Sequence, residues 1–86
     1  MRLPANVRRG EAFLDEHVPG WRDQVDPYTL DLANCHWCVL GQVFGDYDDG
    51  LALLGLTTKD AQRLGFYRWG RQTFDRLTEA WRRVIS

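Results

Sequence analysis

Hydrophobic side chains recur at intervals of three and four residues in five stretches of this chain. That interval is the period of an amphipathic helix, in which one face packs on a core and the other meets solvent. The pattern predicts helices over residues 6–17, 32–44, 47–54, 58–64 and 73–85. The last stretch is the clearest, because Phe74, Leu77 and Trp81 form one continuous apolar stripe.

Glycine and capping residues mark the ends of the two short helices predicted in the middle of the chain. Gly55 and Gly65 each follow a leucine at a predicted helix end, where a glycine can adopt the left-handed backbone conformation that closes a helix. Thr57, followed three positions later by Asp60, is close to a capping box at the start of a helix. These signals predict a tight turn between residues 54 and 58.

The fold class that these elements predict is mainly α, with four to five short helices in one small domain covering residues 1–86. Residues 66–72 have no helical period and hold three aromatic residues and two arginines. We expect a loop or a short β-hairpin there. The expected core consists of Leu14, Val18, Trp21, Leu32, Val39, Leu40, Val43, Leu51, Leu54, Leu64, Phe66, Leu77, Trp81 and Val84.

The composition is that of a folded protein, with 44% hydrophobic and 13% aromatic residues among 86 positions. Large aromatic side chains allow so short a chain to bury apolar area. No run of about 18 apolar residues is present, so we expect no membrane contact. The first residues are basic but lead into no apolar segment, which is atypical of a secretion signal. We therefore expect a cytoplasmic protein with reduced thiols.

Charge is distributed unevenly along the chain although the net charge is only −1. Residues 1–58 hold four basic and nine acidic side chains, whereas residues 59–86 hold seven basic and three acidic ones. Such a chain can attract an acidic partner through its C-terminal part. Alternatively, the two parts pack together and their charges partly cancel.

The string Cys35-His36-Trp37-Cys38 offers two interpretations. A Cys-x-x-Cys pair at a helix start supports disulfide exchange, because the helix dipole and the second sulfur lower a thiol pKa. The redox motif normally follows a strand in a βαβ unit, and the pattern here predicts none. Free cysteines are also among the most buried residues, so we expect both thiols to pack in the interior.

The sequence predicts no metal site and no enzyme. A closed zinc site needs four ligands, whereas on a continuous helix the neighbours Cys35 and His36 would point about 100° apart. His36 lies at the centre of the apolar arc and is expected to be a hydrogen-bonded core residue. Asp46 to Gly50 resembles the start of a calcium loop but has glycine in the wrong position. With no phosphate-binding loop or nucleophile elbow, we expect no catalytic residue and no cofactor.

Residues 56–66 look like the first helix of excisionase-type helix-turn-helix proteins. Those proteins continue with a short turn and a recognition helix, but here the next clear helix begins near Thr73. Arginines in the C-terminal third can still contact phosphates. A DNA-binding regulator is therefore an alternative interpretation.

Residues 20–81 resemble a group of small proteins from actinobacteria and the phages that infect them. The shared strings include Cys38-Val39-Leu40-Gly41-Gln42, Leu64-Gly65-Phe66 and Leu77-Thr78-Glu79-Ala80-Trp81-Arg82. The resemblance implies an intracellular accessory protein without implying a particular activity. It retains the string at Cys38 more firmly than a cysteine at position 35, which weakens a paired-thiol mechanism.

Four residues of the 66–72 segment are the candidate partner-binding residues: Tyr67, Arg68, Trp69 and Arg71. Tyrosine, tryptophan and arginine dominate the energetic hot spots of protein interfaces. The leading hypothesis is a non-enzymatic intracellular protein of phage or actinobacterial origin that binds a macromolecule, with a protein as the first choice of partner. The alternatives are the DNA-binding regulator and a thiol redox protein that uses Cys35 and Cys38.

Overall fold

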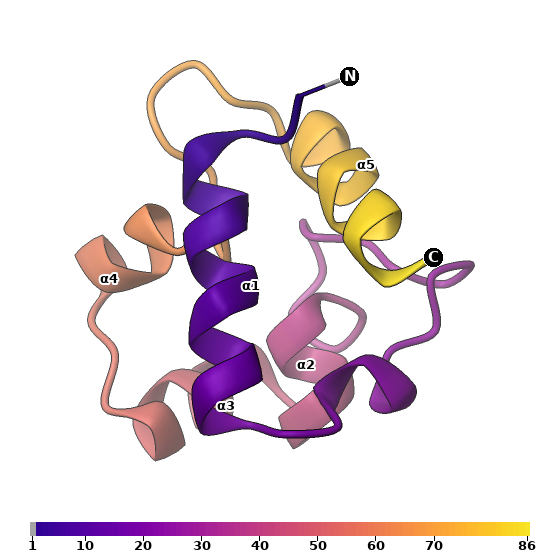
Figure 1. Cartoon of the computed structure of the whole chain (residues 1–86). Coiled ribbons are helices and arrows are strands. Elements are labelled where there is room, and N and C mark those ends of the chain that lie inside the picture. The colour runs from indigo at the N-terminus through magenta and orange to yellow at the C-terminus, as the bar shows by residue number, and fades with distance from the viewer. Residues whose placement is uncertain (1) are drawn as a thin grey trace.

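Helices are the regular secondary structure of residues 2–86, the part of the chain that the computed structural model describes (Figure 1). No strand occurs within these residues, which confirms the mainly α prediction, and residues 66–72 form a loop rather than a hairpin. None of the described helices is long and apolar enough to cross a bilayer. The elements are α1 (Ala5–His17), the 3-10 helix η1 (Trp21–Gln24), α2 (Val39–Phe44), α3 (Tyr47–Leu54), α4 (Thr58–Arg63) and α5 (Phe74–Ile85).

The centre of the fold is Trp81 of α5, which is fully buried. Its ring stacks on Phe66 with 5.6 Å between centroids and meets Trp21 edge-on at 5.8 Å. Its indole N–H donates to the Gly65 carbonyl oxygen at 2.6 Å, so the polar edge of this large side chain is satisfied inside the core. Aromatic packing therefore joins η1, the segment after α4, and α5.

Helix α1 runs between α4 and α5 and packs against both (Figure 1). The approach is close because Gly10 has no side chain. A methyl group there would lie 1.9 Å from the Leu64 carbonyl oxygen and 2.9 Å from the Trp81 ring. A methyl group on Gly65 would lie 2.9 Å from the Cα of Val7, and Gly65 has a φ of 75°, a conformation suited to glycine. Small residues thus set the spacing of these three helices.

The expected core is confirmed for eight residues, and six others prove to be partly buried at its edge. Two of those six lie on α3, which packs mainly on α2 at one end of the molecule. The six partly buried residues are Val18, Val43, Leu51, Leu54, Leu64 and Val84. The buried hydrophobic residues outside that expected core are Val7, Val25, Leu30, Ala61 and Ala80, together with Cys38, whose burial was expected separately.

The helix predicted over residues 32–44 is wrong for its first part, because α2 begins only at Val39. Side chains compete with the helix before that point. The Asn34 side-chain oxygen accepts from the backbone N–H groups of His36 and Trp37 at 2.8 and 3.1 Å. Such bonds favour turns over helix. Cys38 then acts as the N-cap, its sulfur accepting from the Gly41 N–H at 3.2 Å.

The turn predicted between α3 and α4 is confirmed. Gly55 has a left-handed φ of 69°, and the backbone N–H of Leu56 donates to the Leu51 carbonyl at 2.9 Å. Thr57 and Asp60 exchange bonds as a capping box. Both motifs satisfy backbone groups that a helix end leaves unpaired.

Candidate functional site

The four residues predicted to contact a partner are all exposed on the loop between α4 and α5, and we call residues 67–71 the aromatic loop. Trp69 is 50% exposed, as is Trp37 at 51% on the turn before α2, whereas Trp21 and Trp81 are buried. Gly70 follows it with a φ of 65°, which turns the chain back toward α5. The loop thus presents one tryptophan with an arginine on either side.

A partly buried pair of amide side chains, Asn6 and Gln72, holds the aromatic loop on the first turns of α1. The Asn6 side-chain amide donates to the Gln72 side-chain oxygen at 2.9 Å, and the Gln72 amide donates to the Asn6 oxygen at 2.9 Å. The Gln72 oxygen also accepts from the backbone N–H of Trp69 at 2.9 Å. The loop is therefore fixed by polar contacts at the position of Trp69.

An arginine far away in the sequence completes this surface. The Arg9 guanidinium lies 5.8 Å from the centroid of the Trp69 ring, within range of a cation–π interaction. Its Nε–H donates to the Arg63 carbonyl oxygen at 3.0 Å. Sequence reasoning missed Arg9, because nothing in the pattern of α1 indicates which loop lies above its exposed face.

Tyr67 has a different environment from Trp69. Its ring packs against Phe74 edge-on at 5.3 Å and against Tyr47 at 6.3 Å, and 36% of the residue is exposed. Tyr67 therefore attaches the loop to Phe74 and Tyr47 through its ring, while part of the residue stays exposed.

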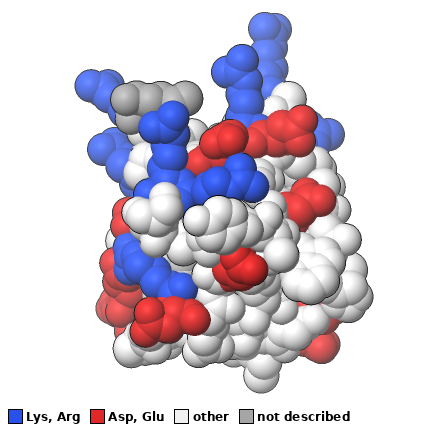
Figure 2. Space-filling model, turned by 90° about the vertical axis from the view of Figure 1, so that its right-hand side faces the viewer, with Lys and Arg blue, Asp and Glu red and all other residues white. Residues whose placement is uncertain are grey.

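Among residues 2–86, no ion pair joins the acidic segment up to residue 58 to the basic segment after it. Every ion pair joins groups within one of these two segments, such as Arg82 with Glu79. On the face that includes α5, most of the Lys and Arg surface lies in the upper half, at the end where Figure 1 shows the N-terminus and the start of α5 (Figure 2). The six exposed basic residues after position 58 are Lys59, Arg63, Arg68, Arg71, Arg76 and Arg83.

A groove of about 470 Å³ lies between the N-terminal segment and α5. Its volume is within the range of ligand sites. Five of its eight lining residues are charged, with an excess of one positive charge, but the apolar parts of the side chains provide most of its wall. Its lining residues are Arg2, Leu3, Pro4, Asp75, Arg76, Glu79, Ala80 and Arg83.

The two cysteines have different environments. Cys38 is buried, as expected, and burial raises the pKa of its thiol even though a bond from the Gly41 N–H opposes the shift. Cys35 is exposed, so the expectation that both thiols pack in the interior is wrong for this residue. A raised pKa keeps Cys38 protonated, which does not favour thiol exchange.

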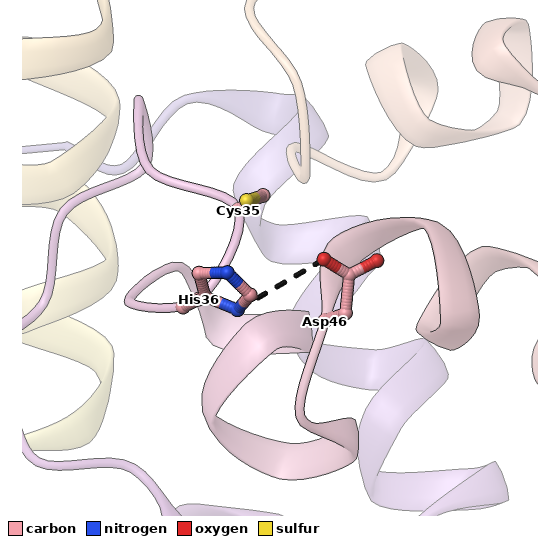
Figure 3. Close-up of side chains that lie close together, drawn as sticks. All are labelled: Cys35, His36 and Asp46. Atoms are coloured by element: carbon pink, nitrogen blue, oxygen red, sulfur yellow. Dashed lines mark ion pairs between the residues drawn. The ribbon is translucent and has the colours of Figure 1, made fainter.

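Cys35 instead belongs to a cluster with His36 and Asp46 (Figure 3). Each side chain offers one potential metal-ligating atom, and the three atoms lie within 4.8 Å of one another. His36 is exposed, so its predicted place in the core is wrong; its Nδ1 lies 3.1 Å from the Gly45 carbonyl oxygen and 3.9 Å from Asp46 Oδ1. The prediction for His36 is wrong because it assumed a helix at residues 35–37, which form a turn.

A small pocket of about 140 Å³ adjoins the cluster and reaches the base of the aromatic loop. It has room for a few water molecules rather than a cofactor. Burial, with the neighbouring Cys38 second, raises the pKa of Tyr47 in its wall to about 12, so this phenol stays neutral. Its lining residues are Leu32, Ala33, Asn34, Cys35, Cys38, Tyr47, Tyr67 and Phe74.

The spacing of α4 and α5 does not match a helix-turn-helix. Residues 64–73 separate the two helices, whereas that motif uses a turn of three to four residues. In addition, Arg82 of α5 is partly buried and donates to the Pro27 carbonyl oxygen at 2.9 Å, which leaves it less able to contact a phosphate.

No family model, curated protein or solved structure matches this chain in comparisons with known proteins.

Proposed function

We propose that this protein is a non-enzymatic binding module that recognises an acidic protein surface through the aromatic loop. The observation that carries the proposal is Trp69, which is half-exposed, has its backbone N–H bonded to the Gln72 side chain, and has its ring within cation–π range of Arg9. An aromatic side chain has only two rotatable bonds, so it loses little conformational entropy when a partner covers it. Such residues contribute most of the binding energy of an interface.

The charge around the loop supports an acidic partner. Arg68 and Arg71 are exposed on either side of Trp69, and no acidic side chain of the described chain pairs with them. Arginines at the edge of an interface accelerate association with a surface of opposite charge and select against basic partners. An origin in actinobacteria or their phages, which the sequence resemblance implies, makes lysates of such cells the source for the partner.

The test compares a loop variant with a matched surface variant. The double variant Trp69→Ala, Arg71→Ala removes the proposed contact, whereas Trp37→Ala removes a tryptophan that is equally exposed, at 51%, on the turn before α2. We expect the loop variant to lose a partner captured by the wild-type chain, with at least about a hundredfold weaker affinity, since two hot-spot residues are removed. Equal retention by the loop variant would refute the proposal.

Nucleic acid is the second candidate, favoured by the exposed arginines and by a tryptophan on which a base can stack. Phosphate contacts make affinity fall steeply with salt. A gel shift with single-stranded and double-stranded DNA at about 50 mM and 200 mM salt separates the candidates. Binding that depends on Trp69 and disappears at the higher salt concentration would replace the protein partner by a nucleic acid.

A further inference from the structure

We infer that Cys35, His36 and Asp46 form a binding site for one zinc ion, with a role beyond the proposed partner contact. Thiolate sulfur, imidazole nitrogen and carboxylate oxygen are the three kinds of ligand that zinc takes from proteins. The fold brings them together from two segments ten residues apart, with their ligating atoms within 4.8 Å of one another. Figure 3 shows the sulfur, the imidazole and the carboxylate at the corners of a triangle.

The separation of the donor atoms requires only a small closure around an ion. In a tetrahedral zinc site, neighbouring ligand atoms lie roughly 3.3–3.6 Å apart, as follows from metal–ligand distances of about 2.0–2.3 Å. The exposed Cys35 and His36 side chains have room to rotate toward an ion, because neither packs in the core.

The backbone that bears the first two ligands is held in place by hydrogen bonds. The Cys35 carbonyl oxygen accepts from the Tyr47 N–H at 2.8 Å, and the His36 N–H donates to the Asn34 side chain at 2.8 Å. This turn lies directly against α2 at Gly41, where a methyl group would come within 2.3 Å of the Cys35 oxygen. Ordered supports of this kind hold metal ligands ready to bind.

The third ligand is fixed by its role as a helix cap. One oxygen of Asp46, Oδ2, accepts from the Asp48 N–H at 2.9 Å at the start of α3. The other oxygen, Oδ1, faces His36. Capping thus uses one oxygen and leaves the other for a metal ion.

The imidazole is oriented as in many zinc sites. His36 Nδ1 lies 3.1 Å from the Gly45 carbonyl oxygen, to which an Nδ1–H can donate. When Nδ1 carries the proton and donates to this oxygen, Nε2 is free to bind a metal, and a zinc-bound histidine commonly donates its other N–H to a carbonyl or carboxylate. Three protein ligands leave a fourth position for water or an external ligand, as in zinc sites that act on substrates.

Cobalt replaces zinc as the probe in the test. The reduced full-length protein is titrated with Co²⁺ under anaerobic conditions, and Zn²⁺ is then added. We expect one Co²⁺ per chain, a thiolate-to-cobalt charge-transfer band with the d–d bands of four-coordination, and loss of both when zinc displaces cobalt. A spectrum with no thiolate band would overturn the site.

Variants assign the ligands one at a time. Cys35→Ser should abolish the charge-transfer band, and His36→Gln and Asp46→Asn should each weaken cobalt binding at least about tenfold, no less than the loss of a supporting contact around a metal. Asparagine caps a helix as well as aspartate does, so Asp46→Asn keeps α3 intact.

Two control variants should bind cobalt like the wild type. Cys38→Ser removes the other thiol and His17→Gln removes the other histidine. A band that survives in Cys35→Ser, or wild-type affinity in Asp46→Asn, would overturn the three-ligand site; the Asp46→Asn result decides the question even if Cys38→Ser fails to fold. The partner-binding variants leave these residues unchanged, so either proposal can fail alone.

Discussion

Replacing Gln72 by alanine should loosen the aromatic loop and destabilise the fold. The variant removes three hydrogen bonds of 2.9 Å, two with the Asn6 side chain and one from the Trp69 N–H. A neutral hydrogen bond contributes about 0.5–1.5 kcal/mol net. In this variant the Asn6 amide group still donates to the Gln62 carbonyl oxygen, and the Asn6 side-chain oxygen still accepts from the Val7 N–H. The expected loss of unfolding free energy is therefore about 2 kcal/mol.

Two measurements check this expectation. Urea unfolding gives the loss of stability, and hydrogen exchange of the Trp69 amide reports whether the loop opens locally. Gln24→Ala is the matched control, because this exposed glutamine lies on η1 and a surface substitution there should change stability by no more than about 0.5 kcal/mol. If Gln72→Ala shows wild-type stability and wild-type exchange at Trp69, the amide pair does not hold the loop and the rigid binding surface has no physical basis.

Three further variants test the rest of the fold. Gly10→Ala should destabilise by about 2–4 kcal/mol in urea unfolding despite better helix propensity, because its methyl would force the Leu64 oxygen away by about 1 Å. Trp81→Phe should lose about 2–4 kcal/mol by the same assay, since the Gly65 carbonyl loses its buried donor and a cavity opens. Hydrogen bonds from the Thr57 backbone and side chain lower the pKa of Asp60, so the charged carboxylate stabilises the folded state at neutral pH. Asp60→Asn should therefore lower the melting temperature at neutral pH, and the difference in melting temperature from the wild type should disappear as the pH falls through the lowered pKa.

Local signals in the sequence predict the helix ends well, because a cap is made by residues a few positions apart. Thr57 and Asp60 illustrate this. The same logic fails where two local signals compete. The apolar period between residues 32 and 44 favours a helix, but the Asn34 side chain bonds two backbone N–H groups and imposes a turn. The spacing of apolar residues contains no information on that competition.

The parts of the candidate sites that could not be predicted depend on contacts between distant segments. Arg9 meets Trp69 only because α1 lies beneath the aromatic loop. Likewise, Asp46 meets His36 only because the turn before α2 folds back onto the start of α3. A helical period identifies which residues face inward on one element, but it contains no information on which exposed residues of two elements become neighbours.

The absence of ion pairs between the first 58 residues and the remainder of the described chain has an evolutionary consequence. An exposed arginine such as Arg68 or Arg71 can change without releasing a paired carboxylate, so substitutions there are nearly neutral for folding. Such a surface can diverge rapidly to follow a changing target while the tryptophan-centred interior stays the same.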